Sequence, residues 1–221
     1  MASASEDLFA AIDAGDVDRV RATLDADPSL AMARDHEAVS ALLRARYRRD
    51  RALVEAVKAR VASLDAFEAA TFGDLDRLAV LLEADPDLTE RRSGDGFTAL
   101  HLAAFFGQDD AVRLLLARGA DPDARGTGWM TGTPLNAAAS ARHATVVALL
   151  LEAGADPDAV QRGGWTSLHS AAHNGDARTV ELLLVHGADP SAVDDDGRSV
   201  GDMAGESGDA TTIAAIGASH A

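Results

Sequence analysis

The sequence predicts an all-α protein, a single solenoid of about seven helix-turn-helix units spanning residues 1–221. Three observations support this fold class. A short motif recurs at a nearly constant spacing, each copy is followed by a leucine-rich run, and the composition is 47% hydrophobic but only 4% aromatic. The core must therefore be built mainly from alanine, leucine and valine, a composition that favours helices.

The recurring motif marks the first helix of each unit. It begins at Thr98, Thr133, Thr166 and, in a degraded form, at Ser199, so that successive copies lie 35, 33 and 33 residues apart. Such a period is typical of one repeated supersecondary unit. Threonine and serine are helix N-caps. Pro134 takes the first helical position, where a missing N–H is harmless.

A second landmark keeps the same phase and predicts a turn after each first helix. Nine residues after the Thr or Ser stand Gly107, Arg142, Gly175 and Gly208. A glycine at this place closes a short helix. The second helix is expected to end at another glycine, such as Gly119, where a left-handed residue is needed. An Asp-Pro loop then completes the unit.

The pattern weakens towards the N-terminus but persists. Ala10–Leu30 and Glu68–Leu88 share it, and Ser40–Val57 indicates a further helix pair between them. Helix pairs this short cannot hold themselves in water, so neighbours must stack. We expect the first and last units to act as caps and the second to be truncated, which leaves open a bend between Ala52 and Phe67. The predicted units cover approximately residues 5–35, 36–62, 63–93, 94–126, 127–161, 162–194 and 195–221.

The repeated pattern, xGxTPLHxAAxxGxxxxVxxLLxxGADPxA, resembles the ankyrin repeat, most strongly over Gly94–Pro190. The segments DGFTALHLAAFFG and GGWTSLHSAAHNGD and the order of units also resemble a group of small bacterial ankyrin-repeat proteins whose activity is largely undefined. The resemblance implies an ankyrin-like solenoid with short β-hairpin-like fingers where the Gly-Ala-Asp-Pro loops are complete. It also implies a concave groove that holds a partner protein.

Composition and motifs argue against several classes of function. A formal charge of −16 makes nucleic acid and membrane surfaces poor partners. The absence of cysteine excludes disulfides, thiolate nucleophiles and Cys-ligated zinc. The sequence has no basic and apolar leader, and no phosphate-binding loop, HExxH or GxSxG motif. We therefore expect a non-enzymatic cytoplasmic monomer with no catalytic residue, no cofactor and no metal.

His101 is expected to be a structural residue. It follows the N-cap Thr98 by three residues, as in a capping box, and the same position holds Asn136, His169 and Asp202 in other units. A catalytic histidine would not tolerate this variation, whereas a hydrogen-bonding residue would. The predicted structural set comprises Thr98, His101, Thr133, Asn136, Thr166, His169, Gly107 and Gly175.

A metal site is the alternative for part of this set. His169 and His173 lie four residues apart on one helix face, and Asp202 and Glu206 follow one period later. Two imidazoles and two carboxylates could ligate zinc or another divalent ion. A metal-binding regulator or a metal-dependent enzyme is therefore one alternative function, and a self-association scaffold is another.

The main functional prediction is a non-catalytic module that binds a partner protein in an aromatic-lined concave groove. The resemblance implies that residues just before the Thr and just before the turn glycine face this groove, where aromatic anchors are usual. The alternative for each aromatic residue is packing on a neighbouring loop. The predicted contact residues are Phe97, Phe105, Phe106, Trp129, Met130, Trp165, His173, Asn174 and Arg198.

A second candidate surface is the basic segment Arg44–Arg60 in this acidic chain. Helical spacing places Arg44, Arg48 and Arg51 on one side, which could accept an acidic segment or a phosphate. The alternative is a solvated face whose charges are paired with nearby carboxylates.

Overall fold

The computed structural model describes residues 3–128 and 131–219. Within them the chain forms α-helices and two short 3₁₀ helices but no strand, so the predicted all-α solenoid is confirmed. The α-helices are α1 (Ala4–Ala14), α2 (Val17–Ala26), α3 (Ala41–Tyr47), α4 (Arg51–Lys58), α5 (Ala66–Phe72), α6 (Leu75–Ala84), α7 (Ala99–Phe105), α8 (Asp109–Ala117), α9 (Pro134–Ser140), α10 (Ala144–Glu152), α11 (Ser167–His173), α12 (Ala177–Val185), α13 (Val200–Ser207) and α14 (Ala210–Ala218).

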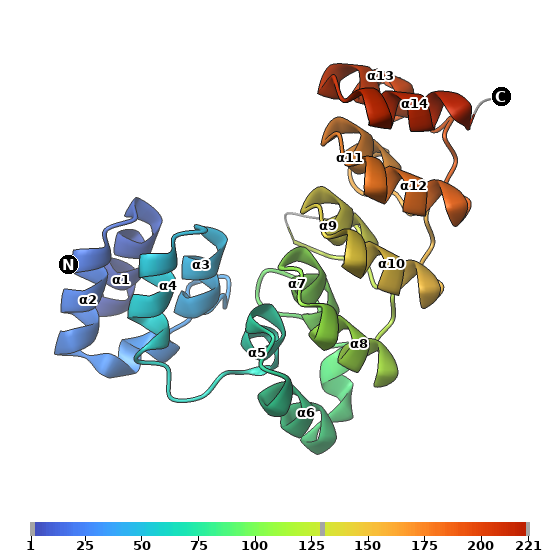
Figure 1. Cartoon of the computed structure of the whole chain (residues 1–221). Helices are drawn as coiled ribbons and strands as arrows, with labels where there is room; N and C mark the ends of the chain where they lie inside the picture. Colours follow the sequence, from blue (N-terminus) through green and yellow to red (C-terminus); the bar gives the residue numbers. More distant parts are fainter. Residues whose placement is uncertain (1–2, 129–130, 220–221) are drawn as a thin grey trace.

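The helices form seven antiparallel pairs that stack in chain order (Figure 1). From α5 to α14 the odd-numbered helices line one edge of a curved stack, and the even-numbered helices line the other edge. Small residues such as Ala103 and Ala138 are fully buried between neighbouring first helices. Leu100 and Leu135 fill the space behind them, so a continuous core runs through all seven pairs.

The turn inside each pair has one left-handed residue. Its φ lies between 57° and 73° in every pair, which suits glycine because a Cβ is crowded in this region. Five pairs have glycine there, but the pairs α3–α4 and α9–α10 have Arg49 and Arg142.

The described residues form three isolated antiparallel bridges, and only one of them follows a complete Gly-Ala-Asp-Pro loop, that of residues 187–190. The loops of residues 119–122 and 154–157, where fingers were also expected, are followed by none among the described residues. These bridges join Arg34 to Ser40, Arg92 to Thr98 and Val193 to Ser199. Two of them lie outside the complete Gly-Ala-Asp-Pro loops. They follow η1 (Pro28–Met32) and η2 (Pro86–Thr89), 3₁₀ helices in which a proline takes the first position after an aspartate.

The stack changes direction between α4 and α5. Figure 1 shows α1–α4 set apart from the curved stack, with a short loop, residues 59–65, running between the two parts. This loop carries no bridge, so the third pair lacks a finger. The finger of the second pair instead packs near the finger of the fourth, because a Cβ on Gly94 would meet the carbonyl oxygen of Glu37 at 2.0 Å. A second core cluster, including Leu43, Phe97 and Leu102, fills this junction.

Candidate partner-binding surface

Thr98 and His101 hold the start of α7 together. His101 donates its backbone N–H to Thr98 Oγ1 (3.4 Å), and His101 Nδ1 lies 2.8 Å from that hydroxyl. The Thr98 backbone N–H points back to Nδ1 at 3.4 Å, and Nε2 donates to the carbonyl of Gly132 in the next unit at 3.2 Å. Burial lowers the pKa of His101 to about 4, so the ring is neutral at physiological pH.

The equivalent residues of the next two units form capping boxes of the same kind. Asn136 Oδ1 accepts from the Thr133 backbone N–H (2.9 Å), and its amide donates to Ser167 Oγ (2.9 Å) across the unit boundary. His169 Nδ1 lies 2.8 Å from Thr166 Oγ1, and burial lowers its pKa. The Nε2 of His169, unlike that of His101, is buried and has no hydrogen-bond partner among the described residues.

The four candidate metal ligands have different neighbours. His169 contacts Thr166, and the Asp202 carboxylate accepts from the Ser199 backbone N–H and hydroxyl, both at 2.7 Å. His173 and Glu206 approach each other only to 3.9 Å. Within the described part of the chain, no group of three or more His, Asp or Glu could hold a metal ion. The metal alternative therefore has no geometric support here.

The three predicted phenylalanines lie at the junction between the second and fourth helix pairs. Phe97 is only 3% exposed and belongs to the junction core, so its ring faces the interior and not the groove. Phe105 and Phe106 are half-buried, and the Phe106 ring stacks on Tyr47 of α3 with a centroid distance of 5.8 Å. The Phe97 ring and part of the Phe106 ring therefore pack against other residues of this chain and stabilise the junction.

Tyr47 fastens the junction from the other side. Its hydroxyl donates to Asp95 Oδ2 at 2.5 Å, and burial together with the charge of Asp95 raises the tyrosine pKa. The repeat pattern of the sequence does not predict this role of Tyr47. This residue is the single tyrosine of the chain and lies within the predicted truncated unit, which was the available signal in the sequence.

Arginine also packs at this junction. The Arg46 guanidinium lies 4.7 Å from the centroid of Phe106 and 5.6 Å from that of Phe72, and Lys58 Nζ lies 4.5 Å from Phe72 on α5. Cation–π contacts of this kind contribute about 0.5–2 kcal/mol each. The first two helix pairs are therefore joined to the rest partly by cations stacked on rings.

Trp165 forms a second aromatic group near the C-terminal end of the stack. Its indole N–H donates to Ser170 Oγ at 2.8 Å, and its ring lies 5.5 Å from His169 and 6.0 Å from His173. Arg198 from the next unit stands 5.3 Å from the ring. The indole is half-buried, while His173 and Arg198 are exposed. These contacts fix the orientation of an accessible aromatic ring.

The remaining predicted contact residues have mixed placements. Asn174, also half-buried, donates its amide to the Ser140 carbonyl at 3.3 Å. Arg198 forms an ion pair with Asp194, in which Nε and Nη2 both approach the same oxygen, Oδ2, at 2.9 and 2.8 Å. Trp129 and Met130 lie outside the described residues.

The basic segment divides between two helices. Arg51 belongs to α4 and pairs with Glu55, so it does not share a face with Arg44 and Arg48 as predicted, because the helix breaks at Arg49. Arg44 donates twice to Asp13, at 2.8 and 2.9 Å.

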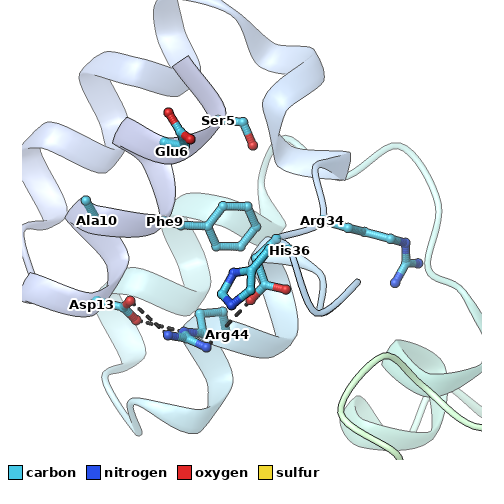
Figure 2. A pocket seen from close by; sticks show the side chains of 9 residues that line it. Ser5, Glu6, Phe9, Ala10, Asp13, Arg34, His36 and Arg44 are labelled. Carbon is cyan, nitrogen blue, oxygen red and sulfur yellow. Dashed lines mark hydrogen bonds and ion pairs between the residues drawn. The ribbon is translucent and has the colours of Figure 1, made fainter. Parts of the chain in front are cut away.

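A cavity of about 490 Å³ opens beside Arg44 on the N-terminal pairs. Figure 2 shows the Phe9 ring at its centre, with His36 close by and Arg44 joined to Asp13 below. Arg44 also lies 3.6 Å from Asp35. Charges of both signs line this cavity and neutralise one another, so it selects no class of ligand.

Comparison with known proteins identifies the class to which this architecture belongs. A family model described as ankyrin repeats, in three copies, matches residues 30–126, 66–161 and 130–194. The chain therefore belongs to the ankyrin-repeat family. Repeats of this kind generally bind protein partners on an extended concave surface.

Two curated relatives come from rice, Oryza sativa subsp. japonica. The E3 ubiquitin-protein ligase XB3 is 49% identical over 61 residues, which is 27% of this chain and 14% of that protein. The probable E3 ubiquitin-protein ligase XBOS31 is 47% identical over 60 residues, again 27% and 14%. This chain thus aligns with about one seventh of each relative's length. The resemblance to small bacterial proteins stays a prediction.

Length and apolar character argue against a transmembrane role for any helix in the part of the chain that the structure covers: none could cross a bilayer. Cytoplasmic residence stays a prediction from the sequence.

Proposed function

We propose that the chain is a non-catalytic module that binds a partner protein on the concave side of its stack, with Trp165 as the principal anchor. The observation that carries this proposal is the fixed, half-exposed indole between His173 and Arg198. Tryptophan and arginine are the residue types most enriched at interface hot spots. A ring already held by Ser170 loses little rotamer entropy on binding.

The proposed contact set extends along the first helices of the stack. It includes Asn174 and the accessible parts of Phe105 and Phe106. Trp129 and Met130 belong to the set on sequence grounds. Phe97 does not, because a partner would have to open the junction core to reach it.

The wider setting follows from charge and composition. A formal charge of −16 and the lack of cysteine remain the grounds for proposing a cytoplasmic monomer that binds neither nucleic acid nor membranes. The ubiquitin-ligase activity in the relatives' names belongs to those proteins. We propose binding, and not catalysis, for this chain.

The test compares proteins captured from a cell lysate by three forms of the chain. Trp165→Ala removes the anchor, whereas Val185→Ala removes an apolar side chain that is 83% exposed at the end of α12, outside the contact set. We expect the wild type and Val185→Ala to capture the same partner and Trp165→Ala to lose it, with all three equally folded by circular dichroism. Equal capture by Trp165→Ala would refute the anchor.

A further inference from the structure

A hollow of about 350 Å³ lies between the N-terminal helix pairs and the curved stack. Because it touches α1, the α3–α4 turn and α7, any occupant would contact both parts of the molecule. Its lining residues are Asp13, Arg44, Tyr47, Arg48, Arg49 and Phe105.

This pocket has an excess of positive charge. Three of its lining residues are arginines, against the single carboxylate of Asp13, which already accepts two hydrogen bonds from Arg44. Arg48 and Arg49 are exposed, and neither makes an ion pair within 4.0 Å with any described residue. Two guanidinium groups are therefore available at the pocket wall.

A third cation, Arg46, lies near the pocket but does not line it. Arg46 is stacked on Phe106, and its buried Nε has no hydrogen-bond partner among the described residues. Burial, with a contribution from the neighbouring Arg49, lowers the pKa of Arg46. An anion bound beside these arginines would offset their mutual repulsion and the desolvation cost of the partly buried Arg46 guanidinium.

The backbone at Arg49 is unfavourable for arginine. Its φ is +57°, at the turn position that holds glycine in five of the seven pairs. A side chain with a Cβ costs about 1 kcal/mol in this conformation. The Arg49 guanidinium lies 6.0 Å from the Phe105 ring, so the strained residue places a cation beside an aromatic surface in the pocket.

The acidic charge of the whole chain does not cancel this local field. At physiological ionic strength the Debye length is about 8 Å, so exposed carboxylates further away are largely screened. Arg44 is paired with Asp13 and Asp35, so Arg48 and Arg49 are the pocket cations whose charge no ion pair with a described residue neutralises.

We propose that this pocket binds an acidic segment of the partner protein, with carboxylates on Arg48 and Arg49 and an apolar side chain against Phe105. The inference rests on the proposed function, because it names the chemistry of a partner that the chain is proposed to bind. A second copy of the chain is the alternative occupant, and sedimentation equilibrium separates it from a partner protein. Free phosphate is disfavoured because it has no apolar group to pack against Phe105.

The test is a selection of random peptides displayed on phage against the full-length chain at neutral pH. Selected peptides are then measured by fluorescence anisotropy with three variants. Arg49→Gly removes a pocket cation at a position whose φ suits glycine. Arg142→Gly makes the same change in the α9–α10 turn, outside the pocket, where φ is +65°. Arg48→Ser removes the second cation.

We expect acidic peptides that lose about fivefold to tenfold in affinity with Arg49→Gly and with Arg48→Ser. Arg142→Gly should bind them as the wild type does. Both glycine variants should be at least as stable as the wild type, so that weaker binding cannot be attributed to unfolding.

The proposal is overturned if no selected peptide depends on Arg49 for binding, if the selected peptides lack acidic residues, or if inorganic phosphate competes as effectively as an acidic peptide. A dimer in sedimentation equilibrium that Arg49→Gly dissociates would assign the pocket to a second copy and also overturn it. Trp165→Ala, assayed in parallel with the same peptides, tests the proposed function separately. If only Trp165→Ala loses binding, the result supports binding at the concave surface and overturns binding at this pocket.

Discussion

The substitution His101→Asn should make folding stability less sensitive to acid. His101 is buried, and its Nδ1 accepts a hydrogen bond while its Nε2 donates one, so the folded state holds the neutral ring. Protonation would turn Nδ1 into a donor facing the Thr98 N–H. Asparagine fills the same position at Asn136, where the amide makes equivalent bonds without titrating.

The pKa of His101 in the folded state determines how much folding stability is lost in acid. The folded pKa, about 4, lies below the ordinary value of 6.5, so between these values the unfolded chain binds a proton that the folded chain excludes. The stabilising contribution is complete above the unfolded pKa and is lost as the pH falls towards 4. At about pH 5 the loss amounts to roughly 2 kcal/mol, a change of about thirtyfold in the folding equilibrium.

The assay is urea denaturation of both proteins at neutral pH and at about pH 5, followed by circular dichroism. Other titrating groups, including His169 and Glu68, are common to the two proteins, so the difference between their acid losses isolates His101. The wild type should lose about 2 kcal/mol more than His101→Asn. Equal losses would show that the buried ring accepts a proton in the folded state and would refute the assignment of hydrogen bonds at the α7 cap.

Three further predictions concern stability. Gly107→Ala should destabilise the fold by about 1–3 kcal/mol in the same assay, because φ is +68° and a Cβ would lie 2.5 Å from the ring of His143. Asp158→Ala should cost about 1 kcal/mol by removing the carboxylate that accepts the Asp189 backbone N–H of the next unit at 2.8 Å; an unchanged midpoint would show that water replaces this bond. Phe106→Ala should cost about 2 kcal/mol and speed proteolysis in the loop between α4 and α5, since its half-buried ring joins the two parts of the molecule.

The sequence predicted those features that depend on residues close together in the chain. The N-caps, the turn glycines and the role of position His101 follow from short-range chemistry that repeats in every unit, so each copy supports the next. The regular spacing of the copies was then enough to predict that the units stack. The same local logic failed for the fingers: two complete Gly-Ala-Asp-Pro loops are followed by no bridge among the described residues, whereas both 3₁₀ turns after Asp-Pro are followed by one.

The placement of the aromatic residues could not be predicted in this way. In a regular stack the ring of Phe106 would face the groove. Here the third pair has no finger, so the second pair reaches the fourth, and Tyr47 covers part of that ring. The result depends on a missing element in one unit and on contacts between residues 59 positions apart. A repeat pattern carries no information about such a contact.

The same irregularity links the two surfaces. In a solenoid each unit is stabilised by its neighbours, so the poorly stacked boundary after α4 is where the two parts would first separate. The cationic pocket lies across this boundary, with Arg49 on one side and Phe105 on the other. A segment bound there contacts both parts only when they are docked, so binding must stabilise the docked arrangement by mass action. Trp165 lies within the regular part of the stack and its contacts do not cross this boundary. Partner binding at the pocket should therefore protect the α4–α5 loop from proteolysis, whereas binding at the indole alone should not.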